Sequence, residues 1–142
     1  MPSPAGDRIA AALSSRAGPD ASASSVALSV FGLCRDLELS LTPIVGLRGF
    51  AALYGRSQYF TNRDFPWIGL PPDGVPMAAD LDALRSVLAA QSAANGMQAG
   101  TALLAAFHSL LMSMLGGALT ERLLADVLLP HSNGCVAQDL TP

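Results

Sequence analysis

The chain has few charged residues for its length and no lysine. Charged side chains make up 13% of its 142 residues, all eight basic residues are arginine, and the net charge is −3. Nucleic-acid-binding domains usually carry a clustered basic surface, so this balance argues against nucleic acid as a partner. Half of the residues, 51%, are hydrophobic. One domain of this length can therefore bury a substantial core and still leave apolar surface for a partner.

Cysteine is scarce, and the N-terminus does not resemble an export signal. Cys34 and Cys135 are the only two cysteines, too few for a disulfide framework. Residues 1–20 lack the basic segment and the long apolar run of a signal peptide. We therefore expect a reducing, cytoplasmic location, with Cys34 as a small buried apolar residue.

No motif that defines a reaction is present. The phosphate-binding patterns G-x-x-x-x-G-K-S/T and G-x-G-x-x-G are missing, as are the H-x-x-x-H, C-x-x-C and E-x-x-H spacings of metal sites. Ser109 and Ser113 lie near His108 in sequence, but they lack the G-x-S-x-G context of a hydrolase nucleophile. Serines at such spacings usually bond back to their own helix. We therefore predict a non-enzymatic protein with no cofactor and no metal.

The most informative stretch is a run from Ala99 to Leu119 without a charged residue. At 100° per residue, its large apolar side chains fall in one arc about 140° wide, and those after Gly116-Gly117 centre on the opposite side. A break at the glycines predicts two helices, 98–116 and 118–129, with the first at the centre of the core. The run is also long enough to span a bilayer. Because His108, two serines and the glycines interrupt it, we favour a soluble core helix.

The rest of the pattern predicts further helices and no strand. One helix covers 23–40 after a cap at Ser22 or Ser24, and Thr42-Pro43 ends it and starts a second helix over 43–62. Asp80 caps a third helix over 81–94, which Asn95-Gly96 ends. Between them lies a Pro-rich loop at 63–79, whose apolar residues are expected to fold back over the helices.

The expected fold is therefore all-α, with about five helices packed around helix 98–116. Residues 1–22 are assigned to a flexible N-terminal segment, although 7–15 could also form a short helix through Ile9 and Leu13. Residues 23–130 form a single helical domain, and 131–142 form a flexible tail.

Five residues are candidates for a ligand site. Arg48, Arg56 and Arg122 could converge on an anion, or each could pair with a nearby carboxylate, as Arg122 could with Asp126. His108, beside the apolar face of the central helix, could bind haem iron or another metal. The simpler interpretation is a histidine at the core edge bonded to a backbone carbonyl. Trp67 could enclose an apolar or anionic ligand between the Pro-rich loop and the central helix.

A second set of residues suggests an interface. Gly46, Gly49 and Leu53 form a strip of low relief on helix 43–62, beside its main apolar arc. Two copies of this strip could pack closely across a two-fold axis. The alternative is that loop 63–79 covers the strip within one chain.

Part of the sequence resembles short all-α bacterial proteins of unassigned function. The residues that carry this resemblance come from two segments: Arg48, Gly49, Phe50, Ala52, Leu53, Arg56, Pro66 and Trp67, then Gly117, Thr120, Arg122 and Leu123, with Leu119 displaced from the pattern. The resemblance covers about half of the chain. It implies a helical domain linked to signalling and brings no catalytic residue.

We therefore predict a helical interaction or regulatory domain in bacterial signalling, which forms a homodimer or binds another protein. The alternative is a helical module that binds a small apolar or anionic ligand near Trp67 and His108.

Overall fold

The computed structural model describes residues 4–19, 22–69 and 80–128. Its elements are five α-helices and one 3₁₀ turn, and no strand occurs in this part of the chain: α1 (Pro4–Ala17), α2 (Ala23–Asn62), η1 (Pro66–Ile68), α3 (Leu81–Ala89), α4 (Ala93–Leu115) and α5 (Gly117–Leu128). The predicted all-α fold is confirmed. The predicted tail at 131–142 and most of the Pro-rich loop, 70–79, lie outside the described residues.

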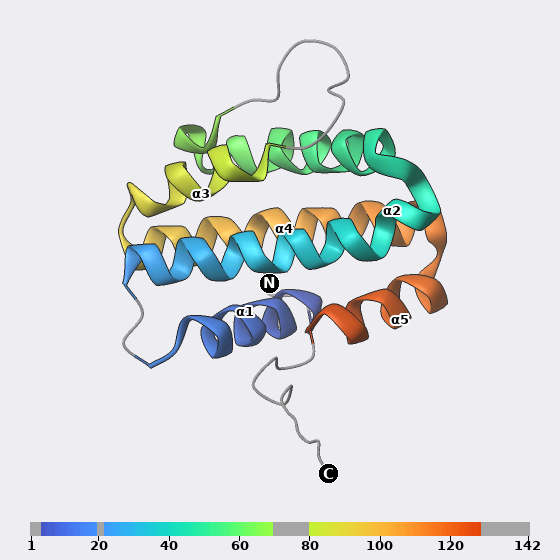
Figure 1. The fold of residues 1–142 in the computed structure, drawn as a ribbon, viewed down its shortest axis with the longest axis horizontal. Helices are drawn as coiled ribbons and strands as arrows, with labels where there is room; N and C mark the ends of the chain where they lie inside the picture. The colour runs from blue at the N-terminus through green and yellow to red at the C-terminus, as the bar shows by residue number, and fades with distance from the viewer. Residues whose placement is uncertain (1–3, 20–21, 70–79, 129–142) are drawn as a thin grey trace.

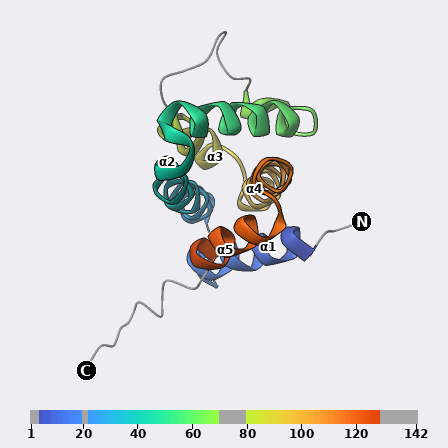
Figure 2. The same ribbon diagram turned by 90° about the vertical axis from the view of Figure 1, so that its right-hand side faces the viewer.

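The helices form three layers around α4. The first half of α2 and α4 lie side by side in the middle layer (Figures 1 and 2). The second half of α2 packs with α3 and η1 on one side, and α1 and α5 form the layer on the other side. The apolar run in α4 therefore lies at the centre of the fold, as predicted, and contributes Leu103, Phe107 and Leu111 to the buried core.

Helix α2 bends at Gly46, not at Thr42-Pro43 as predicted. Gly46 has a φ of 78°, and the helix continues through Pro43. The hydroxyl of Thr42 donates a hydrogen bond to the carbonyl of Glu38, one turn before it in the continuous helix. Pro43 removes one backbone hydrogen bond of the helix, whereas a positive φ interrupts the helical backbone itself. Glycine adopts a positive φ without strain.

The boundary between α3 and α4 also differs from the prediction. Asp80 caps α3 as expected, but α3 ends at Ala89, and Ser92 caps α4 by accepting a hydrogen bond from the backbone N–H of Asn95. The expected stop at Asn95-Gly96 therefore lies inside the first turn of α4. Gly96 is buried there, where a Cβ would stand 3.2 Å from Cγ1 of Val26.

The N-terminal segment belongs to the packed domain. Ile9 and Leu13 on α1 are 1% and 0% exposed, so the helical alternative for 7–15 is the one that the structure adopts. Arg16 ties α1 to its neighbours, because its Nη2 donates to Oδ2 of Asp36 at 2.7 Å and to the carbonyl of Val127 at 3.2 Å. The domain therefore starts earlier than residue 23, and residues 4–17 are not a flexible extension of it.

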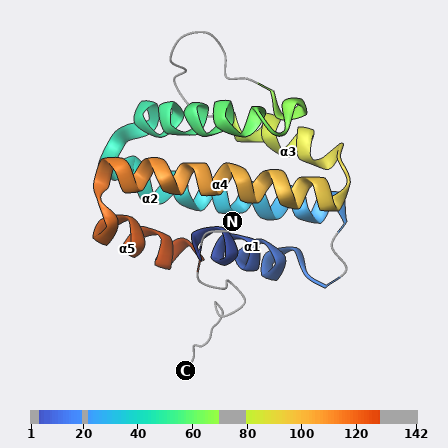
Figure 3. The ribbon, with the colours of Figure 1, turned by 180° about the vertical axis from the view of Figure 1, so that it is seen from behind.

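The predicted break within the charge-free run is confirmed. Gly116 has a φ of 83°, its N–H donates a hydrogen bond to the carbonyl of Met112, and α5 turns back beneath α4 into the layer that also holds α1 (Figure 3). Within the described residues, α4 is the one helix that is long and apolar enough to cross a membrane. One third of its most apolar 18-residue segment is buried inside the protein. The helices that pack on α4 include α1, α2 and α5.

Candidate functional site

The structure does not bring the five predicted ligand residues together. His108 lies on the side of α4 that faces α5, while η1, which carries Trp67, packs on α2 and α3 in the opposite layer (Figure 1). The half-buried Trp67 ring meets Phe65 edge-on, with ring centroids 6.0 Å apart. No site between Trp67 and His108 is therefore formed in this structure.

The three candidate arginines are all exposed and lie apart. Arg48 follows the kink of α2, and Arg56 is two turns further along the same helix, where its guanidinium stacks 5.5 Å from the Phe60 ring centroid. Arg122 is on α5, and it forms no ion pair with Asp126, although both residues are described. Neither convergence on one anion nor the suggested pairing on α5 is seen.

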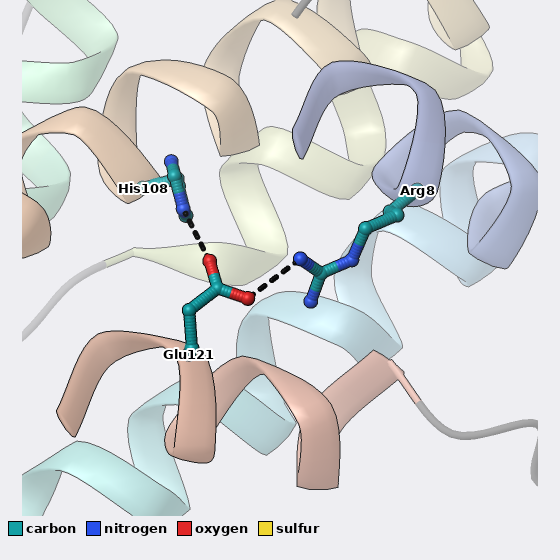
Figure 4. A network of polar contacts seen from close by, with 3 residues as sticks. All are labelled: Arg8, His108 and Glu121. Atoms are coloured by element: carbon teal, nitrogen blue, oxygen red, sulfur yellow. Dashed lines mark hydrogen bonds and ion pairs between the residues drawn. The ribbon is translucent and has the colours of Figure 1, made fainter. Parts of the chain in front are cut away.

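His108 instead belongs to a polar network between three helices (Figure 4). Its Nε2 lies 3.4 Å from Oε2 of Glu121 on α5, and Oε1 of Glu121 accepts a hydrogen bond of 2.7 Å from Nη1 of Arg8 on α1. The Arg8 guanidinium, and then His108, lower the pKa of the Glu121 carboxyl below its ordinary value of 4.5. This arrangement joins the α1–α5 layer to α4. In the described part of the chain, no three His, Cys, Asp or Glu side chains could hold a metal ion together.

A small apolar cavity lies next to this network. Its volume is about 10 Å³, and it is lined by residues of α1, α2, α4 and α5: Ile9, Leu33, Leu37, Leu104, Phe107, His108, Leu111, Leu124 and Val127. A space of this size holds at most about one water molecule, and an apolar lining favours a dry cavity. The packed structure therefore leaves no room for an organic ligand beside His108.

The lowered pKa of Glu121 predicts a pH-dependent contribution to stability. A carboxyl whose pKa is lower in the folded state stabilises the fold above its unfolded-state pKa, and this contribution is lost as the pH falls through the folded-state value. Glu121→Gln should therefore melt below wild type at pH 7, and the gap should narrow as the pH falls below the ordinary pKa of the carboxyl and close below its lowered folded-state pKa. Calorimetric melting curves across this range measure the difference. A constant gap down to the lowest pH would show that the Glu121 charge is irrelevant.

The predicted interface strip does not form one exposed face. Leu53 is only 6% exposed and belongs to the core, and Gly46 lies in the kink instead of on a regular helix. A Cβ on Gly49 would stand 2.9 Å from Cβ of Val45, so its small size accommodates the preceding residues of its own chain. The prediction of an interface strip is therefore corrected. Gly46 forms the kink of α2, Gly49 lies close to Val45 of its own helix, and Leu53 belongs to the core.

A different apolar surface is exposed at one end of the bundle. The α2 kink and the α4–α5 junction lie at the same end of the bundle (Figures 1 and 3), and the perpendicular view in Figure 2 shows the kink on the α2 side and the junction on the α4 side of that end. The large apolar side chains exposed on these segments define what we call the apolar end: Ile44 (46% exposed), Leu47 (51%), Met112 (39%), Met114 (59%) and Leu119 (36%). The periodicity of α4 assigned Met114 to the core, because a helical projection does not show where neighbouring helices stop.

No known protein family, curated protein or solved structure matches this chain. The resemblance to short bacterial helical proteins, and the signalling role that it implies, stay predictions. The surfaces and contacts of the chain itself are therefore the grounds for its function.

Proposed function

We propose that this protein is a non-enzymatic helical interaction domain that forms a two-fold homodimer through the apolar end. The single observation that supports this proposal is the exposure of five large apolar side chains on two segments at the same end of the bundle. Contiguous apolar surface on a soluble domain usually marks an interaction site.

Burial of the exposed apolar surface would offset much of the cost of association. Full burial of one such side chain contributes about 1.5–3 kcal/mol. Two copies bring ten side chains together, each about half exposed, so the total is on the order of 10 kcal/mol. This is comparable with the association cost of about 4–15 kcal/mol. Met112 and Met114 also suit such a contact, because unbranched thioether side chains adapt to the opposing surface.

A role in binding a small ligand is the weaker candidate. The cavity beside His108 is apolar, but it has a volume of only about 10 Å³. Trp67 lies in another layer. We therefore propose the interaction domain, and a place in bacterial signalling and in the cytoplasm accompanies it as a prediction.

A charge placed on the apolar end should separate the subunits. We expect wild type to sediment at twice the chain mass of 14.6 kDa, and Met114→Glu to sediment as a folded monomer, because a carboxylate at the contact would lose its water. Leu28→Glu is the matched control, since Leu28 is 54% exposed near the other end of the middle layer. This control should stay dimeric.

Two results of the same sedimentation series would contradict the proposal. The first is a wild-type monomer at high micromolar concentration. The second is an equal loss of mass in Met114→Glu and Leu28→Glu, which would place the contact outside the apolar end. Circular dichroism of each variant checks that the fold is retained.

A further inference from the structure

The outer side of the second half of α2 is basic and aromatic. Apart from Leu47 beside the kink, the exposed residues of this segment and of its C-cap fall within an arc of about 120° at 100° per residue. They are Arg48, Ala52, Arg56, Tyr59, Phe60 and Arg63, and we call this set the basic aromatic face. Tyr59 is 55% exposed and Phe60 is 37% exposed, so both rings are accessible. The second half of α2, which carries this face, runs along the top of Figure 1, in the layer opposite to that of α5.

The charge of this face is opposite to that of the whole chain. The protein carries a net charge of −3, yet the stretch from Leu39 to Arg63 contains three arginines and no carboxylate. Asp64 is the first acidic residue after it, just beyond the end of α2. A concentrated positive charge on an acidic protein attracts a negatively charged surface and raises its local concentration.

The side chains of the face also support one another. The Arg56 guanidinium lies 5.5 Å from the Phe60 ring centroid, and the Tyr59 and Phe60 rings meet edge-on with centroids 6.0 Å apart. Arginine and aromatic side chains are both residues that anchor a protein at the surface of a bilayer. There the rings enter the headgroup region, and the guanidinium groups meet lipid phosphates.

We propose that the basic aromatic face binds the surface of an anionic lipid bilayer, with α2 parallel to the membrane plane. The shape of the face favours lipid over an acidic protein helix. A partner helix binds best in a groove, whereas this face is the convex outer side of one helix. A planar bilayer can contact all three arginines at once along a helix segment about 22 Å long. This inference is independent of the proposed dimer.

Vesicle binding of the full chain tests this inference. The single tryptophan, Trp67, can report on it by energy transfer to a dansyl-labelled lipid. It is held beside the end of the face, since Asn62 donates a hydrogen bond of 3.0 Å to the carbonyl of Pro66. Transfer should occur with phosphatidylcholine vesicles that contain about one third phosphatidylglycerol, and not with pure phosphatidylcholine. Salt at about 0.5 M should weaken it by screening the charges.

Two triple variants with equal net charge separate a specific face from general attraction. Arg48→Gln/Arg56→Gln/Arg63→Gln should reduce partitioning roughly 100-fold, because each arginine near an anionic surface contributes about a fivefold factor. Arg35→Gln/Arg85→Gln/Arg122→Gln removes the same charge from exposed positions elsewhere and should retain nearly all binding. Tyr59→Ser/Phe60→Ser should also weaken binding, because the rings no longer enter the headgroup region.

Three outcomes would overturn the inference. One is an absence of binding to the anionic vesicles. Another is an equal loss in both triple variants, which would show that net charge alone decides. The third is equally strong binding to pure phosphatidylcholine, which would mean that the arginines do not select the surface. Melting curves of all variants confirm that each is folded before its binding is compared.

Discussion

Leu111→Asp is expected to unfold the protein. Leu111 is 1% exposed on the buried side of α4, and the groups around the neighbouring cavity are almost all apolar, so the carboxylate would have little to bond with. Burying an ionised group without a partner costs several kcal/mol or more, which is comparable with a typical unfolding free energy of about 5–15 kcal/mol. We expect circular dichroism at neutral pH to show loss of most helix and of the cooperative melting transition.

Ser113→Asp is the matched control for this prediction. Ser113 lies two residues further along α4 and is exposed, so the same carboxylate stays in water there. Its melting temperature should remain close to that of wild type. A normal melting curve for Leu111→Asp would mean that Leu111 is at the surface and that α4 is not the central helix.

Gly100→Ala is expected to destabilise the domain, although alanine is the better helix former. In a free helix, this change stabilises by about 1 kcal/mol. Here a Cβ on Gly100 would stand 2.5 Å from Cγ2 of Val30, so α2 and α4 would have to separate or Val30 would have to leave its rotamer. Overpacking of this kind costs about 1–3 kcal/mol. Urea unfolding should show a lower midpoint with an unchanged slope.

A second substitution and a second glycine isolate the cause. Val30→Ala removes the clashing methyl groups, so in its presence the Gly100→Ala change should become neutral or favourable. Gly117→Ala should be tolerated, because a Cβ there would meet only the flexible end of Met112 at 3.5 Å. Stabilisation by Gly100→Ala in the wild-type background would contradict the close approach of α2 and α4.

Signals that act within a few residues were predicted well. Ser22 and Asp80 cap their helices through hydrogen bonds to the N–H groups of Ser25 and Ala83. Gly116 breaks the charge-free run where the apolar arc changes side. Each of these features depends on the backbone conformation and neighbours of one short segment, which the sequence contains directly.

Predictions failed where contacts distant in sequence decide the outcome. Asn95-Gly96 reads as a helix stop, but α4 starts before it, and Gly96 packs against Val26 of α2. Closely packing glycines were expected on helix 43–62, whereas Gly96 and Gly100 of α4 make the close approach to α2. Local stop signals are weak compared with tertiary packing, and no pattern in one helix reveals which partner it will meet.

The candidate site also depends on contacts between residues that are distant in sequence. His108 was identified from its place on the central helix, but its partner Glu121 comes from α5 and Arg8 comes from α1, at sequence separations that no motif spans. Leu53 was assigned to a surface strip because a projection of one helix omits the elements that pack on it, and α3 and η1 both pack on α2. The apolar end likewise appears only when the kink and the α4–α5 junction are placed together.

Cross-linking through a cysteine at position 114 tests most directly whether the apolar end is the dimer contact. Cys135→Ser removes one native thiol, and Cys34 can remain because it is buried and burial raises its pKa to about 12, which makes it unreactive. In this background, Met114→Cys should give a covalent dimer with a short bis-maleimide, and Leu28→Cys should stay monomeric. Equal cross-linking at both positions, or none at position 114, would contradict a dimer formed through the apolar end.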